Sequence, residues 1–266
     1  MNDLYVEPFL GEFGWELFGW QSILRAMSDV YSIRVWCKPG HNYLYRDFAQ
    51  AVHTFDPGPH EPNCHKVSGG RTFERPHPDR KWLTVNDVYR NGWNSLFDGT
   101  LKHEFIKFGT DVGPGYHIAI HARSTKNLNT GFRNWPISNW IEFVKQVGDR
   151  LICSIGTVDG AHHVPGTVDL RSMGVHTTCN TMAGADLVIG PTSGPMHLAA
   201  LCGAPHFVWT GHRRSIDRYA HQWNPFKTEH EIYFNKFEWD AGENWQPSVE
   251  EIIEGIRGFD ESIIRS

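Results

Sequence analysis

Residues 185–201 join three features that together can bind an anion: an apolar run, a loop of small residues and a helix start. Residues 187–189 predict a buried strand, and the glycine-containing loop 190–194 lets the backbone approach a ligand closely. Pro195 suits a first helical turn, where a missing N–H group costs nothing. Because such a helix start presents unpaired N–H groups and the positive end of the helix dipole, the pattern predicts a phosphate site.

Several groups in this loop and first turn could contact the phosphate. The hydroxyl groups of Thr192 and Ser193 add donors beside the backbone N–H groups, and His197 lies one turn into the helix. The alternative interpretation is a plain strand–loop–helix joint of an α/β protein. The candidate contacts in this segment are Thr192, Ser193, Gly194, Met196 and His197.

Three more candidates end predicted strands, where ligands of parallel sheets bind. Arg123 follows a strand at residues 116–121, and its guanidinium suits a bidentate phosphate contact. Trp209 and Gly211 end a strand at residues 206–209, and the indole could stack on a nucleotide base. The alternatives are a surface charge for Arg123 and a core position for Trp209.

The elements that must position these residues alternate between strands and helices, which predicts parallel sheets with crossover helices. The expected strands are residues 4–9, 33–37, 82–86, 116–121, 151–155, 187–189 and 206–209. The expected helices are residues 15–27, 43–52, 94–108, 138–147 with Ser138 as N-cap, 177–183, a helix from Pro195 that Gly203 stops, and 249–257, which a capping box of Ser248 and Glu251 opens.

Two stretches interrupt this alternation. Residues 53–81 are rich in Pro, Gly and His and lack periodicity, so they predict a long irregular loop or lid. Residues 110–115 contain Gly and Pro and predict a linker. The expected fold class is α/β, with two Rossmann-like domains, parallel sheets and an abbreviated N-terminal domain. The expected division is residues 1–112, residues 113–247 and a C-terminal helix in residues 248–266.

Composition limits the possible functions. The 266 residues are 40% hydrophobic and 21% charged, which excludes a disordered chain, and the net charge of -5 argues against broad binding to duplex DNA. The N-terminus lacks the pattern of a signal peptide, and no apolar stretch reaches the length of a membrane span. The five cysteines include no CxxC pair, so we expect a cytoplasmic protein without a disulfide framework or a structural zinc ion.

The segment that opened this section also carries a family resemblance. Residues 186–211, DLVIGPTSGPMHLAALCGAPHFVWTG, resemble the C-terminal signature of the ADP-heptose:LPS heptosyltransferase family. Upstream, residues 118–123 (IAIHAR) and 152–156 resemble two strands of that family's C-terminal domain, and residues 133–136 (RNWP) resemble its basic-x-Trp-Pro element. The resemblance implies a GT-B fold, in which the second Rossmann-like domain binds most of the nucleotide sugar and the first binds the acceptor.

The resemblance also implies roles for single residues. The family's catalytic carboxylate lies in a loop after the first strand, and the matching residue in the sequence LGEFG is Glu12, where Glu replaces Asp. Glu12 would deprotonate the acceptor hydroxyl, and the alternative is a loop carboxylate at a helix start. Glu16 is the rival base, or it pairs with a cation such as Arg25. Arg133 matches the family's basic residue near the diphosphate.

We therefore expect a metal-independent, inverting glycosyltransferase of the hexosyl- or heptosyltransferase type. It would need no cofactor beyond its nucleoside diphosphate sugar, since the chain has no DxD-type metal motif. The alternatives are a nucleotide-sugar epimerase or hydrolase and a non-catalytic nucleotide-sugar-binding protein. The expected acceptor is a saccharide or lipid-linked saccharide, with no integral membrane contact. A modified nucleic acid is the alternative acceptor, because residues 53–108 include Arg71, Arg75, Arg80 and Lys81.

Overall fold

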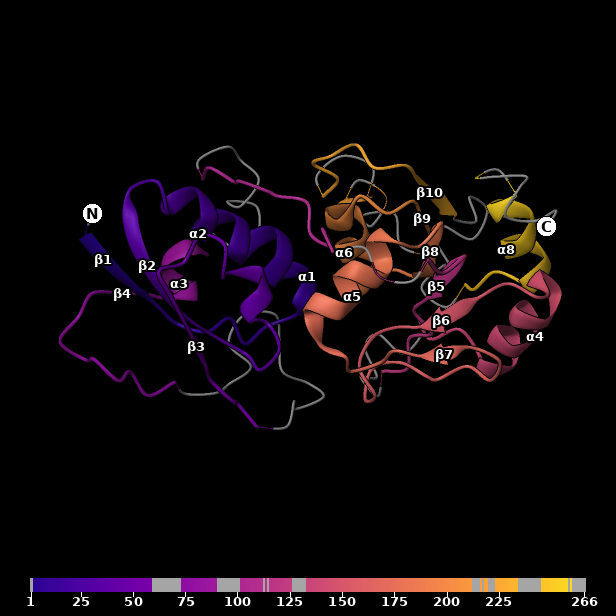
Figure 1. Ribbon diagram of the computed structural model, residues 1–266, viewed down its shortest axis with the longest axis horizontal. Helices are drawn as coiled ribbons and strands as arrows, with labels where there is room; N and C mark the ends of the chain where they lie inside the picture. Colours follow the sequence, from indigo (N-terminus) through magenta and orange to yellow (C-terminus); the bar gives the residue numbers. More distant parts are fainter. Residues whose placement is uncertain are drawn as a thin grey trace. The chain divides into compact units, whose positions relative to one another are not determined.

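The computed structural model describes residues 2–58, 73–89, 101–111, 113, 115–125, 133–211, 216, 218–219, 223–233, 245–257 and 259. The chain forms two compact units, Met1–Ile106 and Lys107–Ser266, each with a parallel β-sheet and helices (Figure 1). The expected α/β class with two parallel sheets is confirmed. The assignment of residues 1–112, 113–247 and 248–266 to separate functional parts stays a prediction.

The N-terminal unit is built on a four-stranded sheet in the order β3-β2-β1-β4. Its strands are β1 (Asn2–Val6), β2 (Tyr31–Cys37), β3 (Ala51–Thr54) and β4 (Trp82–Leu83). Its helical segments are α1 (Phe13–Trp15), the π-helix η1 (Glu16–Trp20), α2 (Gln21–Met27), the 3-10 helix η2 (Asn42–Leu44) and α3 (Val85–Val88). Residues 14–26 are all buried, so the predicted helix after β1 forms the centre of this unit.

The predicted helix at residues 43–52 is wrong. Only η2 is helical there, and the last two residues of the range begin β3, which pairs in parallel with β2. The β-branched residues Val52 and Thr54 favour the extended backbone, and pairing with an open sheet edge outweighs the helical spacing. The predicted irregular loop 53–81 therefore starts inside a strand.

Two further predictions in this unit concern segments that the structure describes only in part. Residues 59–72 of the expected loop lie outside the described residues. The expected helix at residues 94–108 is wrong for residues 101–108, which are not helical, and residues 94–100 lie outside the described residues.

The expected strand 82–86 is shorter than predicted, because Thr84 caps α3 through a capping box with Asp87.

The C-terminal unit has a six-stranded sheet in the order β10-β9-β8-β5-β6-β7. Its strands are β5 (Ile118–Ile120), β6 (Ile152–Ser154), β7 (Val168–Asp169), β8 (Leu187–Pro191), β9 (His206–Trp209) and β10 (His230–Tyr233). The chain runs outward from β5 to β7 and then returns to β8 on the other side of β5. This reversal makes the carboxyl ends of β5 and β8 the topological switch point, where ligands bind in open α/β sheets.

Helices lie on both faces of this sheet (Figure 1). They are α4 (Ile137–Val147), α5 (Gly174–Ala183), α6 (Gly194–Cys202) and α8 (Val249–Ile256). The main core lies between the sheet and the α4–α8 pair, where Trp135 and Trp140 pack on Trp209. The capping box of Ser248 and Glu251 is confirmed.

The ends of two helices show where local signals succeed and fail. Gly203 ends α6 in the left-handed conformation with φ 68°, as its predicted role as a helix stop requires. Ser138 is not the N-cap of α4, because Pro136 already has the extended cap conformation and its carbonyl oxygen accepts from the amides of Asn139 and Trp140. Strand β10 was not predicted.

Candidate functional site

The carboxyl ends of β5 and β8 are linked by a hydrogen bond between His121 and Ser193. His121 follows β5, Ser193 follows β8, and His121 Nδ1 lies 2.9 Å from Ser193 Oγ. His121 is only 4% exposed, and its burial and the charge of Arg123 lower its pKa to about 3. A neutral imidazole therefore holds the Ser193 hydroxyl at the switch point.

Sequence reasoning missed His121, although it is the first polar residue after the apolar strand β5. Two glycines leave room for it. A Cβ atom on Gly156 would lie 3.0 Å from His121 Cδ2, and one on Gly190 would lie 3.1 Å from the His121 carbonyl oxygen. Gly190 belongs to β8, so its small size serves this packing, and the predicted loop begins only after Pro191. Met196 is fully buried with its sulfur against Gly190, which leaves no surface for a ligand contact.

No side chain in the described part of the chain caps the N-terminus of α6. Ser193 is the N-cap in an extended conformation, but its hydroxyl bonds to His121 and caps no amide of the helix. Its own N–H donates to the Tyr219 hydroxyl, which in turn donates to the Ser193 carbonyl oxygen, both at 3.2 Å. The positive end of the α6 dipole is thus available from Gly194 onward.

Thr192 and Arg133 stand beside this helix start. Arg133 Nη1 donates to the Thr192 carbonyl oxygen at 3.1 Å, which places the guanidinium of the predicted basic-x-Trp-Pro element at the end of β8. Thr192 is 3% exposed, and its Oγ1 has no hydrogen-bond partner among the described residues. Such a buried hydroxyl is one that a ligand oxygen could satisfy.

His197 lies in the first turn of α6, but its ring is enclosed by aromatic side chains. The imidazole stacks on Tyr219 at a centroid distance of 4.1 Å and meets Trp223 edge-on at 4.4 Å. Burial, followed by the charges of Arg218, His206 and Arg133, lowers its pKa well below the usual value. The ring is therefore neutral. The whole residue is 7% exposed, and a phosphate contact of His197 stays a prediction.

Trp209 and Gly211, at the end of β9, differ in how deeply they are buried. Trp209 is 3% exposed and packs on Trp135 and Trp140 with centroid distances of 5.3 and 5.6 Å. It is a core residue, so no free ring face supports its predicted stacking on a base. Gly211 lies two residues past the strand and is half-buried.

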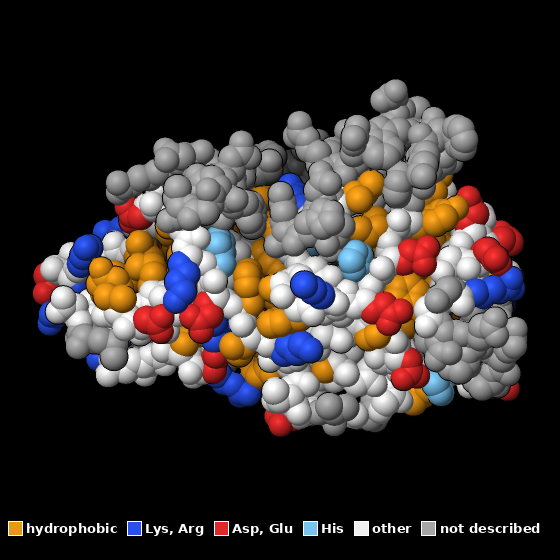
Figure 2. Space-filling view, turned by 90° about the horizontal axis from the view of Figure 1, so that it is seen from above, with side chains coloured by type: hydrophobic (Ala, Val, Ile, Leu, Met, Phe, Trp, Pro, Cys, Tyr) orange, Lys and Arg blue, Asp and Glu red, His pale blue; other side chains and the backbone are white. Residues whose placement is uncertain are grey.

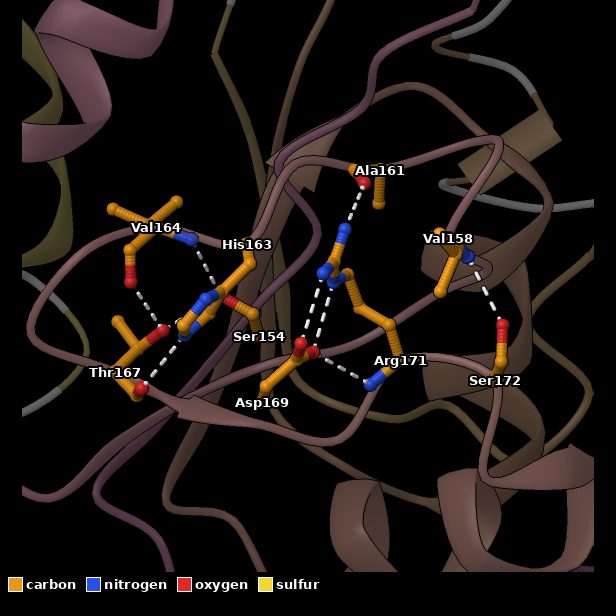
Figure 3. Close-up of polar contacts among 9 residues, drawn as sticks. All are labelled: Ser154, Val158, Ala161, His163, Val164, Thr167, Asp169, Arg171 and Ser172. Carbon is orange, nitrogen blue, oxygen red and sulfur yellow. Dashed lines mark hydrogen bonds and ion pairs between the residues drawn. The ribbon is translucent and has the colours of Figure 1, made fainter.

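Arg123 is held by its neighbours. It is 8% exposed, and its Nη1 donates to Asn134 Oδ1 at 2.6 Å. The backbone of Arg123 bridges to Ala161 in the loop after β6. Figure 3 shows how that loop is fixed: Arg171 makes a bidentate pair with Asp169 and donates to the Ala161 carbonyl oxygen at 2.8 Å. Arg123 therefore supports the edge of the switch point, and its contact with a phosphate stays a prediction.

In the N-terminal unit, Glu12 and Glu16 are in opposite environments. Glu12 is exposed at the N-cap of α1, and the structure records no hydrogen bond or ion pair of its side chain with a described residue. Its carbonyl oxygen accepts from the Trp15 and Glu16 amides. The Glu12 carboxylate is therefore accessible from solvent, and its role as a base stays a prediction.

Glu16 has no exposed surface and three polar partners. Its Oε2 lies 3.0 Å from Lys38 Nζ and 2.9 Å from His41 Nδ1, and its Oε1 accepts from the Tyr45 hydroxyl at 2.8 Å. Burial opposes its charge, but the attraction of His41 and Lys38 lowers its pKa to about 2. Such an acid is a poor proton acceptor near neutral pH, so Glu16 does not suit the role of rival base. Arg25, its expected alternative partner, pairs with Asp47 instead.

The described residues offer neither a cluster of metal ligands nor a helix that could span a membrane. No group of three or more His, Cys, Asp or Glu side chains in the described ranges could hold a metal ion. Among the helices of those ranges, none is long and apolar enough to cross a membrane. Figure 2 shows acidic and basic side chains interspersed on the face it views.

Comparisons with known proteins bear on the fold. No protein-family model and no curated protein matches the chain. Among solved structures, it resembles ADP-heptose LPS heptosyltransferase II of E. coli with a TM-score of 0.60 and 10% identity, over 97% of this chain and 98% of that one. It resembles E. coli heptosyltransferase WaaC with ADP with a TM-score of 0.57 and 11% identity, over 97% and 100% of the two chains.

A third similar structure is a family 9 glycosyl transferase from Veillonella parvula, with a TM-score of 0.56 and 12% identity over 99% of this chain and 98% of that one. Identities this low establish the fold and not the activity. The chain therefore has the GT-B fold of these glycosyltransferases, as the resemblance of residues 186–211 implied.

Proposed function

We propose that this chain is a glycosyltransferase that moves a sugar from a nucleoside diphosphate sugar to an acceptor hydroxyl. The observation that carries the proposal is the switch point of the second sheet, where the start of α6 lies beside Arg133 and the Thr192 hydroxyl. Among the described residues, no side chain caps this helix start and none bonds to the Thr192 hydroxyl. A diphosphate is the anion that suits a helix N-terminus joined to a guanidinium. The GT-B fold supports this reaction class, because the heptosyltransferases that the chain resembles have the same fold.

The proposed reaction is a single displacement that inverts the anomeric carbon. The acceptor oxygen forms a bond to the anomeric carbon while the bond between that carbon and the diphosphate oxygen breaks. The proton of the acceptor hydroxyl passes to the Glu12 carboxylate. Arg133 and the α6 dipole stabilise the charge that collects on the leaving nucleoside diphosphate. In this proposal protein cations take the role that a metal ion has in other transferases, so no metal is required.

The donor class follows from the same reasoning. The two E. coli heptosyltransferases are named for ADP-heptose or were solved with ADP, which makes ADP the first nucleotide to test on this chain. The sugar is a hexose or heptose in this proposal, and the acceptor is a saccharide or lipid-linked saccharide. The net charge of -5 does not favour a nucleic-acid acceptor.

A thermal-shift screen over ADP, UDP, GDP and CDP tests the proposal. A ligand at 100 times its dissociation constant should stabilise the fold by about 2.7 kcal/mol. The variant Arg133→Gln should bind the selected nucleotide about 10-fold or more weakly, because it loses a charge-assisted contact. Arg257→Gln, an exposed guanidinium on the last turn of α8, is the matched control and should bind normally.

The possible outcomes separate the candidate functions. No stabilisation by any nucleoside diphosphate contradicts the proposal. Binding with release of free sugar but no transfer to any acceptor indicates a hydrolase, and conversion of the donor to an epimer indicates an epimerase. Binding with no turnover under any condition indicates a nucleotide-sugar-binding protein.

A further inference from the structure

The position of the His121 ring is fixed by contacts of its backbone and of one ring edge. Its N–H donates to the Ile189 carbonyl oxygen of β8 at 2.9 Å, and its carbonyl oxygen accepts from the Arg123 amide at 2.8 Å. A Cβ atom added to Gly156 would lie 3.0 Å from His121 Cδ2 and 3.2 Å from Nε2, so the backbone lies close against that edge. The ring therefore has little room to turn, and it presents Nδ1 to Ser193.

Ser193 is held as firmly as His121, but its hydroxyl keeps capacity for a ligand. Its N–H and its carbonyl oxygen both bond to the Tyr219 hydroxyl, at 3.2 Å each. The residue is half-buried, and among the described residues its Oγ bonds to His121 Nδ1 alone, at 2.9 Å. Thr192, directly before it, is 3% exposed, and its Oγ1 meets no partner in the described part of the chain. Two hydroxyl groups at the start of α6 can therefore bond to an anion.

The effect of His121 on such an anion depends on which ring nitrogen carries the proton. A serine hydroxyl has one proton to donate and two lone pairs that accept. If Nδ1 accepts from Ser193, the hydroxyl proton is used, and only lone pairs, which repel a phosphate oxygen, face the ligand. If Nδ1 carries the proton and donates to Oγ, the hydroxyl can donate its own proton to the phosphate.

Two arguments favour the proton on Nδ1. No described residue forms a hydrogen bond with Nε2 of the buried ring, so a proton there would be a donor without an acceptor in the described ranges, whereas a proton on Nδ1 is paired with Ser193 Oγ. An anion at the start of α6 also binds more tightly to the tautomer that turns the O–H group towards it. Because a ligand shifts an equilibrium towards the state that it binds better, the anion itself selects this tautomer.

We infer that His121 is a positioning residue of the donor site: its Nδ1–H donates to Ser193 Oγ, so that the Ser193 hydroxyl donates to a phosphate oxygen of the nucleoside diphosphate. This inference rests on the proposed function and deepens it. His121 does not contact the substrate, because it acts through the proton of one hydroxyl. The site gains a directed donor without a further charge.

A double-mutant cycle measured by calorimetric titration tests the inference. The probes are the nucleoside diphosphate selected by the screen and inorganic pyrophosphate. Ser193→Ala should weaken the binding of both about 10-fold or more, because a hydrogen bond to a charged group is lost. His121→Leu should weaken it about 5- to 10-fold in the wild-type background but less than about 2-fold in the Ser193→Ala background, since it acts only through that hydroxyl.

Two further variants separate positioning from a purely structural role. His121→Asn places an amide near the position of Nδ1 that can donate to Ser193 Oγ, so binding should stay within about 2-fold of wild type. His206→Leu is the matched control, because it removes another buried histidine of the same unit, whose Nδ1 bonds to the Ala204 carbonyl oxygen. Its diphosphate affinity should stay within about 2-fold of wild type, whatever its stability.

Nitrogen NMR of the histidine side chains measures the tautomer directly in the wild-type protein. The His121 signals are assigned by their absence from the spectrum of His121→Asn. With pyrophosphate bound, the proton should reside on Nδ1. A proton on Nε2 in that complex would overturn the inference.

The outcomes distinguish this inference from the proposed function. If the wild-type protein binds no nucleoside diphosphate, the proposed function fails, and the inference fails with it. If it binds, and His121→Leu weakens binding less than about 3-fold or equally in both backgrounds, only the inference is overturned. Should His121→Leu fail to fold, the position of the proton in the wild-type complex decides.

Discussion

The two units of this protein each bury an ionisable side chain near the carboxyl end of their sheet, and they treat it in opposite ways. In the N-terminal unit Glu16 stays charged, because Lys38 and His41 surround it. In the C-terminal unit His121 stays neutral and bonds to the Ser193 hydroxyl. The N-terminal unit therefore balances a buried negative charge with neighbouring cations. The C-terminal unit keeps its buried histidine neutral at a sheet edge where arginines supply the positive charge.

The difference shows how a buried group can serve a site without taking part in its chemistry. The Glu16 cluster ties η1 to the residues after β2, and Lys38 Nζ also reaches the Gly11 carbonyl oxygen at 3.4 Å, in the loop that carries Glu12. The His121 contact ties the ends of β5 and β8 together. One unit thus steadies a candidate base, and the other steadies a candidate anion site.

The largest effect is expected for Glu16→Gln, which removes the charge of the buried carboxylate in the N-terminal unit. The amide cannot neutralise Lys38, so a half-buried cation loses its charged partner in an otherwise buried cluster, and the free energy of unfolding should fall by about 3 to 5 kcal/mol. Urea denaturation measures it. Glu142→Gln, on the exposed side of α4, is the control and should change stability by less than about 0.5 kcal/mol. A loss below about 1 kcal/mol for Glu16→Gln would mean that the cluster does not stabilise the unit.

Glu12→Gln should affect turnover and leave stability nearly unchanged. The amide keeps the shape but cannot accept a proton, so transfer should slow by roughly 100-fold, the usual scale for a lost general base. Donor affinity should stay within a few-fold, because the phosphate contacts belong to the other unit. Transfer rates and nucleotide titration on one preparation separate the two quantities. Unchanged turnover would assign the proton to another group, and an equal loss of donor binding would make Glu12 a structural residue.

The two units should also respond differently to acid. The lowered pKa of His121, about 3 against 6.5 for the free side chain, means that protonation favours the unfolded state. Its contribution to stability is complete above about pH 6.5 and declines as the pH falls towards 3, by about 2 kcal/mol at pH 5. His206, with a pKa lowered to about 4, acts in the same direction. Glu16 has its pKa lowered from 4.5 to about 2, so its contribution is lost only below about pH 4.5.

Measuring the free energy of unfolding between pH 7 and 4.5 tests the expected loss of the histidine contributions to stability. The slope against pH should flatten in His121→Asn, which removes the titrating ring, whatever the absolute stability of the variant. His163→Asn, an exposed histidine in the loop after β6, should keep the wild-type slope. An unchanged slope in His121→Asn would show that His121 does not control the acid response of the C-terminal unit.

The smallest expected effect is that of chelation. With Arg133 and the start of α6 as the counter-charges, transfer measured in EDTA should equal transfer in buffer alone. Loss of turnover with EDTA, and its recovery with magnesium or manganese, would contradict metal independence and assign part of the leaving-group role to a bound ion.

Much of the C-terminal unit could be predicted from sequence because its signals are local. The apolar run in β8, the proline at the start of α6 and the glycine after it define the strand, turn and helix without reference to the rest of the chain. The same holds for the capping box of Ser248 and Glu251. Local signals are weaker in the N-terminal unit, where the sequence predicts a helix for the first two residues of β3 and a loop for the rest, because only pairing with β2 decides the conformation of this strand.

The sequence by itself determined which elements exist around the candidate site, since helix starts, helix stops and buried strands depend on neighbouring residues. Only the tertiary structure decided which side chains meet there. Ser193 bonds to His121 and Tyr219, which are 72 and 26 positions away, and Glu16 bonds to Tyr45 at 29 positions. Sheet order and helix packing set such contacts, and because neither is encoded in local spacing, a charge such as that of Glu16 looks equally suited to catalysis and to burial until its partners are known.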